Sequence, residues 1–286
     1  MPDRGLRHPS GVLDLRAGLE RFDTWRRPPA PALAELVEHY WRVQWDVPGP
    51  EPYMQHTLSN ASVHLCVQEG RSRIQGVVTG RFTTPLLGRD RVFGVKFRPA
   101  GFRPFLGSPV APLTDRSIPV AAVFGEDGDA YVRRVLALGG DDEAAAETAD
   151  AFLLARLPAP DPAVAEVNRL VALIVGKRAI TRVDQVVERA GTGTRTLQRL
   201  FHEYVGVSPK WVIQRYRLHE AAQRLAEERD VSLADLALDL GYADQAHFVR
   251  DFKSVVGRPP AAYARDADGA QPAQPARSAS EAQAAT

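Results

Sequence analysis

The chain has 286 residues, 44% of them hydrophobic and 25% charged, which is typical of a soluble globular protein with about two domains. No apolar run approaches the roughly 18 residues of a membrane span. The N-terminus lacks the apolar segment of a signal peptide, so a cytoplasmic location is expected. The net charge is +1, but residues 161–265 carry 16 Lys and Arg against 13 Asp and Glu, and this net +3 is by itself a weak indicator of nucleic-acid binding. The single cysteine, Cys66, excludes an internal disulfide bond.

The N-terminal half is predicted to combine helices with a small sheet. Apolar residues at helical spacing predict a helix over Ala32–Tyr40. Within residues 53–98, alternating apolar residues and spaced glycines predict a small, mostly antiparallel sheet. Short helical pieces are expected at 102–106 and 120–124, and an Ala-rich helix is expected over Glu143–Leu157.

Three prolines within residues 158–162 resist helix formation and predict a stiff linker. This linker separates an N-terminal regulatory or dimerisation domain, 1–157, from a helical domain, 163–265. Residues 266–286 are rich in Ala, Gln, Ser and Pro without periodicity, so a disordered tail is expected there. The expected fold class is α+β, with a mixed N-terminal domain and an all-α C-terminal domain.

The helical domain contains the same helix–turn–helix pattern twice, about fifty residues apart. In the first copy an apolar-spaced helix leads into Gly191, and the helix after the turn carries Phe201. In the second copy the apolar helix leads into Gly241, and Phe252 recurs after a turn one residue longer. Such repetition is informative because each helix–turn–helix unit places one recognition helix in a major groove of DNA.

Outward-facing positions on the two recognition helices identify the side chains offered to DNA. Arginine donates two hydrogen bonds to guanine, and glutamine both donates to and accepts from adenine. Asp244 is expected to cap its helix rather than to contact a base, whereas His247 is equally consistent with packing or a surface position. The predicted base-reading residues are Arg195, Thr196, Gln198, Arg199, Gln245, His247 and Arg250, and the predicted phosphate contacts or caps are Thr194, Lys210, Arg215, Asp244 and Lys253.

The segment between the two copies predicts how both recognition helices reach one duplex. Ser208 is a suitable N-cap and Pro209 a suitable first helical residue, and no helix breaker follows before Glu228. A helix of this length spans roughly 30 Å, close to the ~34 Å of one turn of DNA. The chain is therefore predicted to read two successive major grooves as a monomer.

Five motifs of the helical domain match in order and spacing a known DNA-binding domain, namely Thr196–Phe201, Gly206–Pro209, Ala237–Tyr242, Asp244–Phe252 and Gly257–Tyr263. They resemble the AraC/XylS family over about 100 residues. The first turn, Gly191-Thr192-Gly193, departs mildly, since members more often have an apolar residue and then Ser after the Gly. The resemblance implies a bacterial transcription regulator that binds double-stranded DNA and often contacts RNA polymerase. It places the family's base-reading positions on Arg195, Gln198, Arg199, Gln245, His247 and Arg250.

Enzyme motifs are absent or incomplete in the sequence, so no catalytic residue, metal or cofactor is predicted. His202-Glu203 and His219-Glu220 begin like a zinc-protease helix, but the required second histidine is missing in both places. An enzymatic N-terminal domain that uses DNA binding for targeting is the minor alternative.

The role of the N-terminal domain stays open between sensing of a small molecule and formation of a homodimer. Arg98 and Arg103 are candidates for holding an anionic effector, although solvent-facing positions are favoured. Cys66 lies among strand-forming residues and is expected to be a semi-buried side chain rather than a sensor. Aromatic residues are candidates for a ligand pocket, although an ordinary core is favoured; they are Trp25, Trp41, Trp45, Tyr53 and Phe82.

Overall fold

The computed structural model describes residues 21–228 and 230–269. The N-terminal domain contains a six-stranded antiparallel sheet of order β1-β2-β7-β4-β5-β8 and a separate antiparallel pair, β3-β6. The strands are β1 (Phe22–Arg27), β2 (Val37–Val47), β3 (Tyr53–Thr57), β4 (His64–Val67), β5 (Arg73–Gln75), β6 (Phe82–Leu86), β7 (Gly88–Phe97) and β8 (Ser117–Ile118). The predicted mostly antiparallel sheet is confirmed.

The helix predicted over Ala32–Tyr40 is wrong. Only Pro31–Leu33 forms a short 3-10 turn, η2, and the long strand β2 begins at Val37. Strand β2 pairs with β1 on one side and β7 on the other, and its Tyr40 is fully buried. Tertiary pairing of a segment rich in aromatic and β-branched residues therefore overrides the local helical spacing.

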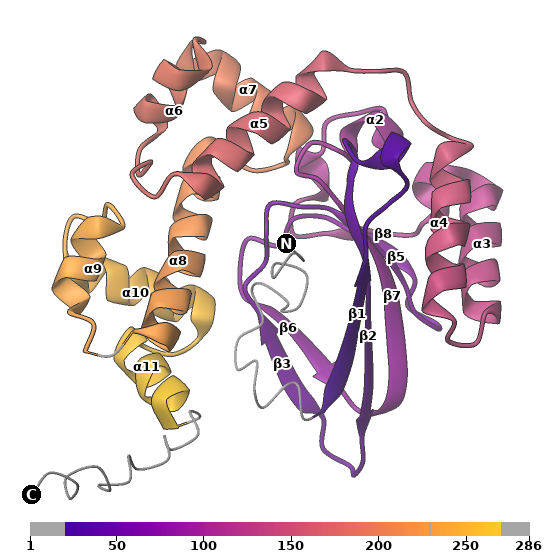
Figure 1. Ribbon diagram of the computed structural model, residues 1–286, viewed down its shortest axis with the longest axis horizontal. Helices are drawn as coiled ribbons and strands as arrows, with labels where there is room; N and C mark the ends of the chain where they lie inside the picture. The colour runs from indigo at the N-terminus through magenta and orange to yellow at the C-terminus, as the bar shows by residue number, and fades with distance from the viewer. Residues whose placement is uncertain (1–20, 229, 270–286) are drawn as a thin grey trace, which may run out of the picture.

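Two helices cover one face of the six-stranded sheet (Figure 1): α3 (Ala121–Ala137) and α4 (Asp142–Leu154). Tyr40 Oη donates a 2.6 Å hydrogen bond to Asp150 of α4, and Tyr131 of α3 stacks on Phe152 with ring centroids 4.4 Å apart. The sheet is thereby fastened to its helical layer. The shorter α2 (Arg103–Leu106) and η3 (Ala111–Leu113) connect β7 to β8.

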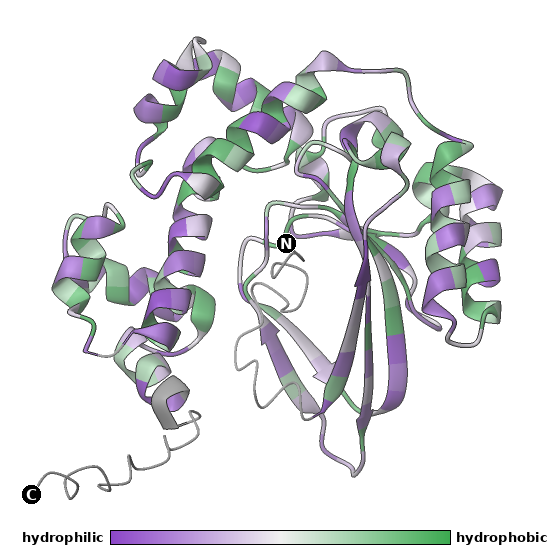
Figure 2. Ribbon diagram, in the orientation of Figure 1, coloured by the Kyte–Doolittle hydropathy of each residue, from purple (hydrophilic) through white to green (hydrophobic). Residues whose placement is uncertain are grey.

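The C-terminal domain is entirely helical, as predicted, and lies on the other side of the sheet from α3 and α4 (Figure 1). Its helices are α5 (Pro162–Gly176), α6 (Val183–Ala190), α7 (Thr194–Tyr204), α8 (Pro209–Glu227), α9 (Leu233–Asp239), α10 (Gln245–Val256) and α11 (Pro260–Gly269). Helix α8 carries both hydrophilic and hydrophobic bands along its length (Figure 2). It is a continuous connector between the two helix–turn–helix units, α6–α7 and α9–α10.

Helix α11 corrects the boundary expected for the disordered tail. The helix continues to Gly269, so residues 266–269 are helical, and residues 270–286 lie outside the described part of the chain. Arg258 donates a 2.6 Å hydrogen bond to Asp266, and Tyr263 packs edge-on against Phe252 of α10. These contacts hold α11 on the second unit beyond the last recognised motif.

The two domains share packing rather than meeting only through the linker. Val110 N donates to Glu203 O at 2.8 Å, and Thr114 Oγ1 donates to Gly206 O at 2.7 Å, so the loop before β8 holds the C-terminal end of α7. Leu58, in the loop after β3, is buried in the hydrophobic core of the second unit. The N-terminal domain therefore contacts both helix–turn–helix units.

Candidate nucleic-acid interface

The first unit exposes one side of its second helix. Gly191 ends α6 in the left-handed region with φ of 62°, which an L side chain would strain. Leu197 and Phe201 of α7 are fully buried, as the apolar spacing predicts. Thr194 does not cap α7: the N-cap is Gly193, without a side-chain hydrogen bond, and Thr194 is already the first helical residue.

The second unit has a longer turn, fixed by three contacts. Asp244 is the N-cap of α10, and its Oδ1 accepts a 2.7 Å hydrogen bond from the backbone N–H of His247. Tyr242 Oη donates to Asp251 Oδ2 at 2.6 Å, which ties the turn to the middle of α10. Gly241 has φ of 80°, and a Cβ there would lie 2.4 Å from the Cβ of Thr181, just before α6. The turn of the second unit thus packs directly against the start of the first.

The seven side chains predicted to read bases all lie on exposed positions of α7 and α10: Arg195, Thr196, Gln198, Arg199, Gln245, His247 and Arg250. Between them the apolar residues face inward, so each helix separates a packing side from a polar side. Arg199 lies 3.6 Å from Glu203, but its side chain is 68% exposed. An ion pair this exposed contributes little, so Arg199 is available to another partner.

A concave surface with a volume of about 360 Å³ lies between the two units. Lys210 and Gln214 of α8 line it, and His247 of α10 and Arg182 before α6 line it from the other helices. Two of these four side chains, Arg182 and Lys210, are cations, which suits a phosphate-bearing partner. We call this surface, defined by Arg182, Lys210, Gln214 and His247, the central hollow.

The central hollow and the N-terminal domain lie on opposite sides of helix α8. Lys210 and Gln214 face the hollow. Arg215 and His219 instead bond to the N-terminal domain, at Thr79 O and Ser59 O. Because successive residues of an α-helix are rotated by about 100°, these two pairs lie roughly opposite each other around the helix. The N-terminal domain therefore leaves the hollow side of α8 uncovered.

The predicted phosphate contact of Arg215 is wrong. Its side chain is 2% exposed, donates a hydrogen bond to Thr79 O, and lies over the Trp211 ring at 4.7 Å. Burial lowers the pKa of Arg215 to about 10. Lys210 and Lys253, the other predicted phosphate contacts with charged side chains, are exposed. The positions of charged residues in the sequence could not distinguish the buried Arg215 from these exposed lysines, because the N-terminal domain buries Arg215 only in the folded chain.

Comparison with known proteins identifies the helical region. Residues 186–266 match a helix-turn-helix domain family, and residues 26–119 match a domain of unknown function (DUF6597). The probable transcription factor PqrA of Proteus vulgaris is 34% identical over 82 residues, which is 29% of this chain and 66% of PqrA. This region is similar to AraC-family transcriptional regulators.

Other proteins are similar to this chain in sequence or in structure. The transcriptional activator NphR of a Rhodococcus species is 32% identical over 102 residues, which is 30% of each chain. The crystal structure of ToxT from Vibrio cholerae O395 aligns with 87% of this chain and 99% of ToxT, at 14% identity and a TM-score of 0.36. The chain thus spans less than two thirds of the first relatives that it matches in sequence.

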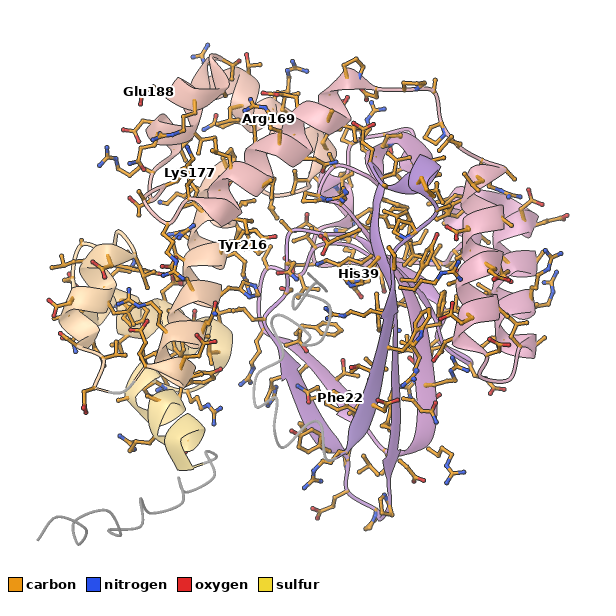
Figure 3. The ribbon with its side chains drawn as sticks, viewed as in Figure 1. Phe22, His39, Arg169, Lys177, Glu188 and Tyr216 are labelled. Carbon is orange, nitrogen blue, oxygen red and sulfur yellow. The ribbon has the colours of Figure 1, made fainter. Side chains whose placement is uncertain are left out.

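The N-terminal domain contains a second candidate site, a pocket between the six-stranded sheet and the β3-β6 pair. We call it the inter-sheet pocket; it has a volume of about 250 Å³. Of the aromatic residues predicted to line a pocket, Trp41, Trp45 and Phe82 do so, whereas Trp25 and Tyr53 are not among its lining residues. Figure 3 labels Phe22 and His39, which mark two levels of this pocket along the sheet.

The arginines predicted as candidates for an effector have structural partners instead. Arg98 Nε donates to Ala34 O at 2.6 Å, and Arg103 pairs with Glu203 of α7 at 2.9 Å. Cys66 lines the inter-sheet pocket, and burial raises the pKa of its thiol to about 11, so the reactive thiolate is disfavoured. Sequence reasoning missed Arg26 and Lys96, two of the cations that line this pocket, because they lie on β1 and β7, and only the folded sheet brings these strands to one pocket.

Within the described residues, no group of three or more His, Cys, Asp or Glu side chains could hold a metal ion. His56 bonds to Thr83, and His64 accepts a 3.2 Å hydrogen bond from Trp41 Nε1. None of the helices that the structure describes is both long and apolar enough to cross a membrane.

Proposed function

We propose that the chain is a sequence-specific regulator that reads two successive major grooves of double-stranded DNA, with α7 in one groove and α10 in the next. The observation that carries this proposal is the unbroken helix α8 between Pro209 and Glu227. Its 19 residues span roughly 28 Å, which is near the ~34 Å of one DNA turn. The uncovered central hollow supports an approach of DNA from that side.

The test selects bound sequences from a random DNA library with the full chain. The proposal predicts a bipartite site with half-site centres about one helical turn apart. Arg199→Ala is expected to relax base preference in one half-site and Arg250→Ala in the other, each at a cost of about 1–3 kcal/mol if the contact is bidentate. Arg133→Ala is the matched control, because Arg133 is exposed on α3 on the far side of the sheet. A single half-site that is indifferent to Arg250→Ala would contradict two-groove reading.

We further propose that the N-terminal domain modulates DNA binding. The support is a set of hydrogen bonds between this domain and the DNA-binding helices. The backbone carbonyls of Thr79 and Ser59 bond to side chains of α8, and Val110 and Thr114 bond to the backbone at the end of α7. The inter-sheet pocket favours a sensing role over a purely dimerising one. Light scattering of the full chain tests the homodimer alternative directly.

Contact with RNA polymerase belongs to the same proposal. It is supported by the relative NphR, which is described as a transcriptional activator. In vitro transcription from a promoter that carries the selected site should rise when the chain is added. Unchanged or reduced transcription, with the site occupied, would overturn activation and leave DNA reading intact.

A further inference from the structure

One carboxylate connects the N-terminal domain to a predicted base-reading arginine. Glu203, near the end of α7, accepts a 2.9 Å hydrogen bond at Oε1 from Arg103, the first residue of α2. Its other oxygen, Oε2, lies 3.6 Å from Nη1 of Arg199, which is one helical turn earlier on α7. Glu203 therefore forms ion pairs with two arginines, one from each domain.

The two ion pairs differ in how firmly they are held. The side chains of Arg103 and Glu203 are 26% and 23% exposed, whereas that of Arg199 is 68% exposed. The guanidinium group of Arg103 also lies 5.4 Å from the centroid of the Tyr204 ring, and the backbone carbonyl of Glu203 accepts a 2.8 Å hydrogen bond from Val110 N. A partly buried ion pair is screened less by water and salt than an exposed one. Arg103 is therefore the stronger partner of Glu203, and Arg199 is the weaker one.

The position of Arg103 is fixed by the sheet of the N-terminal domain. Phe102 and Phe105, on either side of Arg103, pack against Phe97 of β7 with ring centroids 5.0 and 5.7 Å apart. Helix α2 therefore moves with the sheet and not with α7. Because Arg103 is held in this way, it reaches Glu203 only while the two domains are docked.

The charge balance at Glu203 decides how strongly this carboxylate retains Arg199. With Arg103 in place, a cation at 2.9 Å neutralises the carboxylate and occupies one of its oxygens. Without Arg103, both oxygens and the full negative charge are open to Arg199, whose planar set of donors matches a carboxylate in a bidentate pair. An arginine paired in this way does not offer the same donors to guanine. Glu203 then competes with the base for Arg199.

We propose that Arg103 is a positioning residue for DNA reading: it neutralises Glu203 and thereby leaves Arg199 available to its base. When the N-terminal domain separates from α7, Glu203 retains Arg199 in an ion pair and the first half-site is read less well. Arg250 of α10 forms no ion pair within the described part of the chain, so the effect is confined to α7. This inference rests on the proposed two-groove reading and specifies how docking of the N-terminal domain acts on one recognition helix.

The experiment compares base preference at the two half-sites, with the full chain throughout. Fluorescence anisotropy measures the affinity of each variant for the selected site and for sites with one base changed, at the position that depends on Arg199 or at the one that depends on Arg250. The ratio of these affinities cancels the general loss of attraction that follows when a cation is removed. Arg103→Met should lower the ratio at the Arg199 base about two- to fivefold, the range of an exposed ion pair, and leave the ratio at the Arg250 base unchanged. The retained second ratio also verifies that the variant is folded.

Further variants distinguish the shared carboxylate from a general loosening of the domain contact. Arg103→Lys keeps a cation beside Glu203 and should keep the wild-type ratio. The double variant Arg103→Met/Glu203→Gln should restore the ratio, because no carboxylate then competes for Arg199. Arg116→Met is the matched control and should leave both ratios unchanged, because Arg116 is an exposed arginine between α2 and β8 and is not a partner of Glu203 within the described residues.

The outcomes separate this inference from the proposal on which it rests. An unchanged ratio at the Arg199 base in Arg103→Met would overturn the inference, and so would an equal loss at both bases. A double variant that discriminates as poorly as Arg103→Met would also overturn it, because the loss would then not depend on the charge of Glu203. A wild-type chain that selects no bipartite site would instead overturn the two-groove reading itself.

Discussion

Leu58 provides the sharpest test of the contact between the two domains. This leucine belongs to the N-terminal domain, yet it is 1% exposed and packs in the same core as Leu218 of α8 and Phe252 of α10. Truncation of a fully buried leucine to alanine costs about 2–5 kcal/mol, because apolar contact is lost and a cavity remains. The Leu58→Ala substitution therefore destabilises the arrangement in which the two domains are docked, because Leu58 has no such contact when the domains are apart.

A cost of about 3 kcal/mol corresponds to roughly a 100-fold shift toward the undocked arrangement. Hydrogen exchange followed by mass spectrometry of the full chain reads this shift locally. Peptides that cover 57–62 and 76–81, the loops that hold α8, should exchange faster by up to that factor. Peptides around 110–114, which hold the first unit, should change much less.

Leu86→Ala is the matched control, because Leu86 is 3% exposed and packs in a cluster confined to the N-terminal domain. It should loosen that cluster without selective exchange in the two loops. The reasoning fails if Leu58→Ala gives the same exchange pattern as Leu86→Ala. It fails equally if the loops at 57–62 and 76–81 keep their protection.

Two further predictions concern a pair of charged side chains on α8 and two histidines whose pKa is lowered by burial. Arg215→Met should lower the melting temperature and leave the salt dependence of DNA binding unchanged, because Arg215 bonds to Thr79 inside the protein. Lys210→Met should instead reduce the slope of the logarithm of the DNA-binding constant against the logarithm of the salt concentration by about 1, as the loss of one phosphate contact does. Burial lowers the pKa of His219 to about 4 and that of His64 to about 3, so below pH 6.5 the unfolded chain binds protons that the folded chain refuses. The free energy of unfolding should therefore fall as the pH drops from 6.5 toward 4, by up to about 1.4 kcal/mol per pH unit for each histidine. Urea titrations at pH 7.5, 6 and 5 measure this slope, and His219→Gln should flatten it; an unchanged slope would contradict the assignment.

The sequence predicted the helical region well because its information is local. Caps, turn glycines and apolar spacing recur twice in short windows, and the structure has α8 begin at Pro209 with Ser208 as its N-cap. The helix predicted over Ala32–Tyr40 was wrong because β2 pairs with β1 and with β7, and β7 is distant from it along the chain. Helical spacing carries no information about partners of this kind, whereas a helix finds its hydrogen bonds within itself.

The predicted phosphate contact of Arg215 was wrong for a similar reason, because its burial depends on contact with the other domain. Its neighbours in sequence, Arg217 included, look like a basic stripe, but Arg217 donates to Ile174 O and pairs with Glu220, and both arginines are 2% exposed. A solvated lysine such as Lys210 and a buried arginine are indistinguishable until the opposite side of α8 is known to be covered. The N-terminal domain covers the side of α8 that carries Arg215, and its inter-sheet pocket therefore lies next to the helix that connects the two helix–turn–helix units. The proposed regulation of DNA binding through this contact therefore requires no change within α7 or α10, only a change in how firmly α8 is held.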